Sequence, residues 1–112
     1  MTKEHDLYCY LSYRDYLRDA YQILKAKDSK YSFRYISQQV GSSSPSWLSD
    51  ITKGRINLTE NYLAKLVQLL KMGKKQERFF KLLVSYDQAP SHELKRKYLD
   101  EILMSKEQIG RA

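Results

Sequence analysis

The 112-residue chain has one cysteine, two histidines, two prolines and no long apolar run. A lone cysteine, Cys9, cannot close an internal disulfide, and no cysteine and histidine residues have the spacing of a metal site. No segment approaches the roughly 18 apolar residues of a transmembrane helix. The start of the chain lacks the apolar region of a secretory signal peptide. The sequence therefore predicts no metal, no membrane and a cytoplasmic location.

Features of catalysis are also missing. The four glycines are scattered at the expected ends of helices, so they do not form a phosphate-binding loop. No nucleophile lies in a recognisable pattern with a base, and no pair of carboxylates marks a catalytic pocket. The sequence thus indicates a protein that is not an enzyme, with no cofactor and no evident small-molecule substrate.

Positive charge and tyrosine are abundant. The net charge is +7 and the pI is about 9.5, which favours a polyanionic partner, nucleic acid before an anionic membrane surface. The alternative is that the charge only keeps the protein in solution. Ten tyrosines are present, and at helical spacing they suit half-buried seams between helices better than stacking on bases.

Apolar residues recur at helical spacing throughout, with capping residues between the segments. The expected fold is an all-α bundle of five to six helices in one domain over residues 1–112. Its core covers residues 12–88, and a C-terminal helix covers 91–107. The helices before the last one are expected at 13–27, 33–40, 45–53, 60–72 and 75–87.

The segment from Phe33 to Asn57 predicts a helix-turn-helix. Ser32 is a good N-cap for its first short helix, which ends at Gly41, where positive φ is expected. Ser44 is expected to cap the second helix, with Pro45 at the first helical position. Two short helices around a tight glycine turn are typical of this DNA-binding motif.

The second helix of such a motif presents its N-terminal half to the major groove. Small serines let a helix approach base edges closely. Trp47 either lies between the helices, which we favour, or protrudes toward DNA, and the Asp50 carboxylate could accept a bond from a cytosine amino group. The candidate base contacts are Ser44, Ser46, Trp47, Ser49 and Asp50.

Positive charge flanks this helix and predicts phosphate contacts. Each of these residues could equally be a solvated charge or, for the serines, a turn residue. Their clustering around one motif favours the interface. The candidate phosphate contacts are Lys30, Arg34, Ser43, Lys53 and Arg55. A second basic cluster at residues 71–81 is interpreted as a solvated face.

The run from Gly41 through Ile51, followed by TKGRINLTENYLAKLVQLL, resembles the lambda-repressor-like helix-turn-helix family. Ser37 and Gly41 match the small residue and the turn glycine of that family, and Lys53-Gly54-Arg55 matches its glycine with basic neighbours. The turn is one residue longer than is usual there. The resemblance implies a bacterial DNA-binding regulator that acts on double-stranded DNA, with a homodimer as a possible state.

A narrower resemblance covers almost the whole chain. LSYRDYLRDAYQ, the helix-turn-helix segment and FFKLLVSYDQA are similar to the N-terminal part of a family of conserved hypothetical bacterial proteins, abundant in Bdellovibrio and Fibrobacter. That resemblance also implies a transcriptional regulator. The alternative function is a protein-interaction or dimerisation module that uses the helix-turn-helix scaffold without binding DNA.

Overall fold

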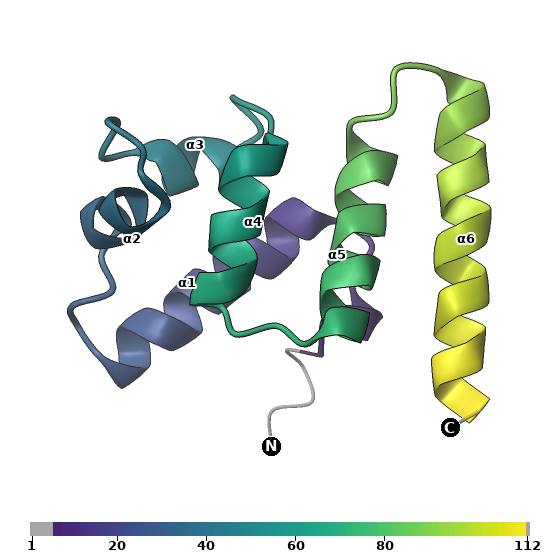
Figure 1. Cartoon of the computed structure of the whole chain (residues 1–112), viewed down its shortest axis with the longest axis horizontal. Coiled ribbons are helices and arrows are strands. Elements are labelled where there is room, and N and C mark those ends of the chain that lie inside the picture. Colours follow the sequence, from purple (N-terminus) through teal and green to yellow (C-terminus); the bar gives the residue numbers. More distant parts are fainter. Residues whose placement is uncertain (1–5, 112) are drawn as a thin grey trace. The chain divides into compact units, whose positions relative to one another are not determined.

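The computed structural model describes residues 6–111, with side chains up to residue 108. Within them the chain forms a short 3-10 helix and six α-helices and contains no strand, which confirms the all-α prediction (Figure 1). None of these helices is long and apolar enough to cross a membrane. The elements are η2 (Leu7–Cys9), α1 (Tyr13–Lys27), α2 (Phe33–Val40), α3 (Trp47–Thr52), α4 (Glu60–Leu69), α5 (Lys74–Asp87) and α6 (His92–Arg111).

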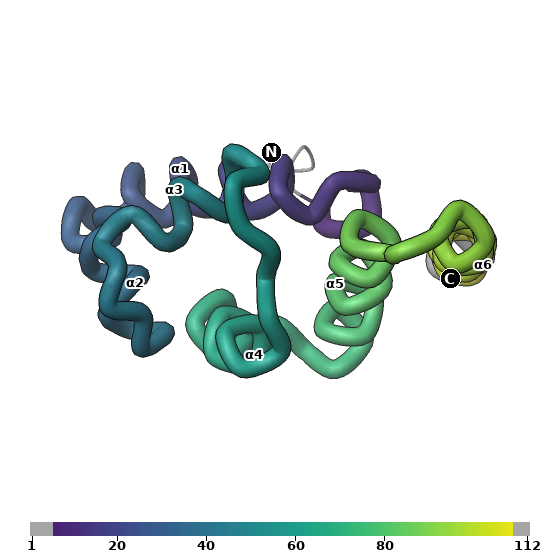
Figure 2. The backbone as a smooth tube through the Cα atoms, turned by 90° about the horizontal axis from the view of Figure 1, so that it is seen from above, coloured from purple at the N-terminus to yellow at the C-terminus, as the bar shows by residue number. Residues whose placement is uncertain are grey.

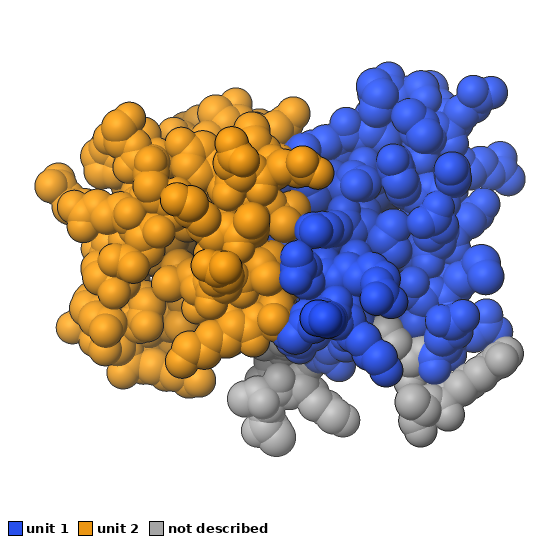
Figure 3. Space-filling view, viewed as in Figure 1, with its two compact units in different colours: residues 1–13, 73–112 blue, residues 14–72 orange. Residues whose placement is uncertain are grey.

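The backbone divides into two compact units (Figure 3). Unit 1 combines Met1–Tyr13 with Gly73–Ala112, of which residues 6–13 and 73–111 are described, and unit 2 is Arg14–Met72. The single domain over 1–112 stays a prediction. Unit 2 carries ten lysines and arginines against five carboxylates, a net charge of +5. Most of the excess positive charge of the chain therefore belongs to unit 2.

Unit 1 is built on α5 and α6, which lie antiparallel and side by side (Figures 1 and 2). Phe79, Phe80 and Leu83 of α5 are buried, and Ile102 of α6 is buried with them. Leu103, which the apolar pattern placed on the same face, is 54% exposed. Successive helical residues are about 100° apart, so only one of these two neighbours can face α5.

Unit 2 contains α2, α3, α4 and all of α1 after its first residue. Helix α2 packs on both α3 and α4, and the stacked rings of Tyr21 and Phe33, with centroids 4.0 Å apart, link α1 to α2. The predicted apolar stripes are confirmed, because they supply most of the buried residues of unit 2. These are Tyr16, Leu17, Ala20, Ile36, Val40, Leu48, Ile51, Leu58, Leu63, Leu66 and Val67.

Two predicted glycine stops are confirmed and one is wrong, and the C-terminal helix, predicted to end at 107, continues to Arg111. Gly41 and Gly54 have φ values of 86° and 78°, the left-handed conformation expected after a helix. Helix α4, however, ends through Lys71, which takes φ 57°, with the amides of Lys71 and Met72 donating to carbonyls of the preceding turn. Gly73 has φ −76° and is instead the N-cap of α5.

The tyrosines lie where the sequence indicated. Tyr13 and Tyr16 are buried, and the other eight are half-buried, so none of the ten is fully exposed. The hydroxyl of Tyr13 donates to Oε1 of Gln88 over 2.7 Å, and its ring meets Phe80 edge to face. The tyrosines serve mainly as packing residues with a polar tip.

Candidate functional site

Helix α2 is fixed at both ends by the residues that the sequence indicated. The hydroxyl of Ser32 accepts a hydrogen bond from the Tyr35 amide over 3.1 Å. At the other end, the Gly41 amide donates to the Gln38 carbonyl and the Ser42 amide donates to the Ser37 carbonyl. This pair of bonds is a Schellman motif, and it directs the chain away from α2 into the serine-rich turn.

The turn between α2 and α3 has a hydrogen-bonded structure of its own. The Trp47 amide donates to the Ser44 carbonyl over 3.2 Å, and Ser46 has φ −100° and ψ 16°. Residues 44–47 are therefore a type I β-turn with Pro45 at its second position, where proline is favoured. The buried Ser37 hydroxyl donates to the Pro45 carbonyl over 3.3 Å and holds the turn against α2.

This turn corrects the predicted start of the second helix. Helix α3 begins at Trp47, its N-cap is Ser46, and no side chain caps it. Ser44 does not cap the helix, because it opens the β-turn. Pro45 suits either place, since its fixed φ fits both the first residue of a helix and the second residue of a turn.

Helix α3 has a buried face and an outer face. Trp47, Leu48 and Ile51 are buried. Ser46 and Lys53 at its ends are exposed, and Ser49 and Asp50 between them are half-buried. The spacing of three and four residues places these last four on one side of the helix. The outer face of α3 is thus short and polar, and Lys53 at its end is its one long side chain.

Trp47 belongs to the core. Its side chain is 4% exposed, and its ring lies 5.2 Å from that of Tyr62 on α4. Trp47 is thus buried, as we favoured over protrusion toward DNA, but its burial is nearly complete and its ring contact is with α4. This burial also removes Trp47 from the candidate base contacts, because a ring with so little exposed surface cannot reach a base edge.

A chain of hydrogen bonds runs along the outer face of α3. The hydroxyls of Ser44 and Ser46 lie 3.3 Å apart, and Ser46 donates to Oδ2 of Asp50 over 3.2 Å. The other carboxylate oxygen of Asp50 accepts from Nη1 of Arg55 over 3.3 Å. The Asp50 carboxylate therefore pairs with the Nη1 group of Arg55, and an external anion would have to compete with it for that group.

The remaining candidate phosphate contacts differ in their surroundings. Arg34 and Lys53 are exposed, and neither has an ionic partner among residues 6–111. Ser43 is exposed in the turn. Lys30 lies with the aromatic rings of Tyr31 and Tyr35, whose centroids are 5.4 and 5.7 Å from its ammonium. The structure thus joins Ser44, Ser46, Asp50 and Arg55 by hydrogen bonds and places Lys30 in an aromatic setting.

Arg14 supports this face and was not a sequence candidate. Its Nη1 donates to the carbonyls of Ile51 and Ile56 over 2.6 and 2.9 Å, and its Nη2 donates to Oδ1 of Asn57 over 3.0 Å. One guanidinium therefore holds the end of α3 and the loop that carries Lys53 and Arg55. No local sequence signal marks Arg14, because its partners are 37 to 43 residues away.

The chain matches no protein-family model, and it has no significant match to a curated protein or to a solved structure. Among residues 6–111, no three metal-binding side chains lie together. The chemistry of this site must therefore be judged from its own geometry. It offers hydroxyls and a paired carboxylate on the outer face of a short helix, with cations beside it.

Proposed function

We propose that unit 2 binds duplex DNA as a helix-turn-helix in a transcriptional regulator, with the outer face of α3 in the major groove. The observation that carries this proposal is the outer face itself. It holds three short polar side chains, Ser46, Ser49 and Asp50, with Lys53 at the end of the helix, while the large apolar residues of α3 are buried on its other face. Short hydroxyl side chains permit close approach to base edges, and Ser44, Ser46 and Ser49 supply them.

The distribution of charge supports the same proposal. Residues 29–58 contain four cations and one carboxylate, and that carboxylate, Asp50, already pairs with Arg55. Arg34 and Lys53 need not break an internal ion pair to bind phosphate. Nonspecific affinity for DNA comes mainly from such phosphate contacts, so we assign Arg34 and Lys53 the leading part in it.

The proposal is tested by the salt dependence of binding to a random-sequence duplex, measured by fluorescence anisotropy. The variant Arg34→Gln/Lys53→Gln should lower the log–log slope by roughly 2, since each phosphate contact contributes about 0.9. The matched control is Arg96→Gln/Lys97→Gln, which removes the same charge from exposed positions of α6. The control should keep the wild-type slope.

Equal slopes for the two double variants would mean that only net charge matters, and they would contradict the proposal. Absence of duplex binding at low salt, together with concentration-dependent self-association, would instead favour the protein-interaction module. The ion pair between Asp50 and Arg55 favours the protein-interaction module, because it lowers the positive potential of the outer face of α3.

A further inference from the structure

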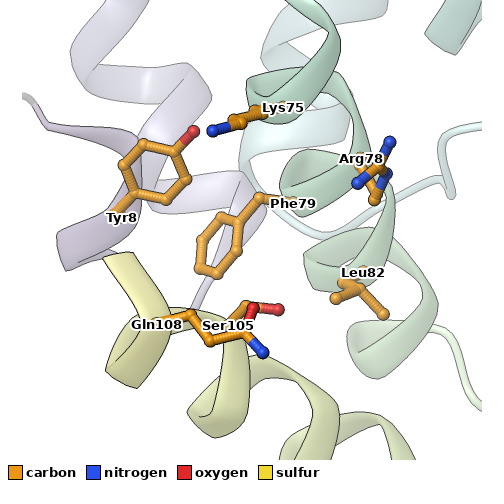
Figure 4. Close-up of a pocket in the computed structure, with 7 residues that line it drawn as sticks. All are labelled: Tyr8, Lys75, Arg78, Phe79, Leu82, Ser105 and Gln108. Carbon is orange, nitrogen blue, oxygen red and sulfur yellow. The ribbon is translucent and has the colours of Figure 1, made fainter. Parts of the chain in front are cut away.

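Unit 1 contains a pocket of about 370 Å³ between η2, α5 and α6. This volume lies within the range of small-molecule sites in proteins. Its apolar lining comes from Tyr8, Phe79 and Leu82, and the rings of Tyr8 and Phe79 meet edge to face with centroids 5.0 Å apart. Figure 4 shows Phe79 projecting from α5 toward the part of α6 that carries Ser105 and Gln108.

The aromatic wall is held in place by its own neighbours. Tyr8 lies in η2, whose N-cap Asp6 accepts a hydrogen bond from the Tyr8 amide over 3.0 Å. The adjacent Leu7 is 2% exposed and anchors this turn. Phe79 is 3% exposed. The apolar surface is therefore preformed and does not depend on a ligand to assemble it.

Two cations lie over this apolar surface. Lys75 and Arg78 line the pocket, and Lys75 points toward the Tyr8 hydroxyl (Figure 4). Within residues 6–111 neither has an ionic partner, and Glu77, the acid between them in sequence, pairs with Lys81 over 3.2 Å. The pocket thus combines an aromatic and aliphatic wall with two positive charges that form no ion pair with a carboxylate of residues 6–108.

The two cations do not stabilise α5. Lys75 and Arg78 are three residues apart, so they are neighbours on the helix surface and repel each other. Lys75 also lies in the first turn of α5, where the helix dipole disfavours positive charge. Departures from the local rules of stability are expected at functional sites. An anion in the pocket would relieve the repulsion.

We propose that this pocket binds a small amphipathic carboxylate, with its apolar body against Tyr8, Phe79 and Leu82 and its carboxylate between Lys75 and Arg78. Ser105 and Gln108 of α6 line the pocket with polar groups for the remainder of the ligand. This site is separate from the outer face of α3, and its existence does not depend on whether unit 2 binds DNA.

The test uses the full chain and three probes: 4-phenylbutyrate, the uncharged 4-phenyl-1-butanol, and acetate. Binding is followed by amide chemical shifts in a ¹⁵N-labelled sample. The phenylbutyrate should shift the amides of residues 75–82 and 105–108 with the highest affinity. The alcohol should bind more weakly, because it lacks the charge, and acetate weakest, because it lacks the apolar body.

The variant Lys75→Gln/Arg78→Gln should weaken phenylbutyrate binding by about tenfold, to near the level of the alcohol. Because neither side chain forms an ion pair within the described part of the chain, this variant should melt at the wild-type temperature or above. The control variant Arg96→Gln/Lys97→Gln removes the same charge from α6, outside the residues that line the pocket, and should leave the affinity for phenylbutyrate unchanged. Equal binding of acid and alcohol, equal shifts with acetate, or no shift at millimolar phenylbutyrate would each overturn the proposal.

Discussion

Replacement of Asp50 by asparagine should strengthen binding to duplex DNA. Asparagine has nearly the same shape: its one amide oxygen can accept from Arg55, while its NH2 group donates to the hydroxyl of Ser46, which now donates to the second carboxylate oxygen. The change removes a negative charge from the outer face of α3 and frees Arg55 from an ion pair of 3.3 Å. Both effects favour a phosphate close to this face.

The size of the effect follows from that ion pair. Two unit charges 3.3 Å apart attract each other by about 1.3 kcal/mol in bulk water, and exposed pairs measured in proteins give about 0.2–1 kcal/mol. About 1 kcal/mol corresponds to roughly a fivefold change in affinity. If Arg55 then contacts a phosphate, the log–log salt slope should steepen by about 0.9.

Anisotropy titrations of a random-sequence duplex at low salt and near 0.15 M salt measure both quantities. The gain should shrink as salt rises, because the screening length falls to roughly 8 Å at about 0.15 M. The matched control is Asp100→Asn, which alters net charge equally at an exposed position of α6. An unchanged or weaker affinity of Asp50→Asn, or an equal gain from Asp100→Asn, would refute the assignment of this face to DNA.

Four further outcomes are expected. Arg14→Ala should lower the free energy of unfolding by about 1.5–3 kcal/mol in chemical denaturation, because Arg14 holds the end of α3 through charge-assisted bonds; a change below measurement error would contradict this role. Trp47→Ala should cost about 3–5 kcal/mol as a core truncation, and a fully stable variant with altered DNA preference would show that Trp47 faces the groove after all. Gly73→Ser should raise the free energy of unfolding by about 0.5–1 kcal/mol, since φ −76° suits serine and the Gln76 side chain already accepts a hydrogen bond from the amide of residue 73. The matched substitution Gly54→Ser should lower it by about 1–2 kcal/mol, because residue 54 has φ 78°. Selection from a random duplex pool should enrich one sequence family, and a palindrome within it would indicate a two-fold dimer; a pool that stays random would exclude specific base contacts.

Local rules were sufficient for most of the fold. The helices α1 and α2 have the predicted bounds, and Ser32 and Gly41 have the predicted roles, because each depends on residues close in sequence. The two errors at helix ends arose where two local solutions compete. Pro45 fits a helix start or a β-turn, and α4 could end at Gly73 or at a strained Lys71. At Pro45 the bond from the buried Ser37 hydroxyl favours the turn, and at Lys71 the local bonds to the carbonyls of Gln68 and Val67 close the helix before Gly73.

The candidate site was less accessible from the sequence, since its main interactions join distant segments. The contacts of Arg14 with Ile51, Ile56 and Asn57 cross from α1 to the end of α3 and the loop after it. The pocket at Lys75 and Arg78 likewise requires α5, α6 and η2 together. From sequence alone these two cations were indistinguishable from a solvated face.

The short length of α3 makes these distant contacts part of any recognition by unit 2. A helix of six residues is far below the roughly 12–15 residues at which isolated helices become even marginally stable. Its outer face therefore keeps its orientation through Trp47 beneath it and Arg14 at its end. A change that loosens Trp47 or Arg14 should disturb base contacts before phosphate contacts. Hydrogen bonds to base edges require a fixed geometry, whereas an exposed cation such as Lys53 can reach a phosphate in many conformations. Loss of sequence preference with retained nonspecific affinity is thus the signature expected of conservative changes at these two residues, such as Arg14→Lys.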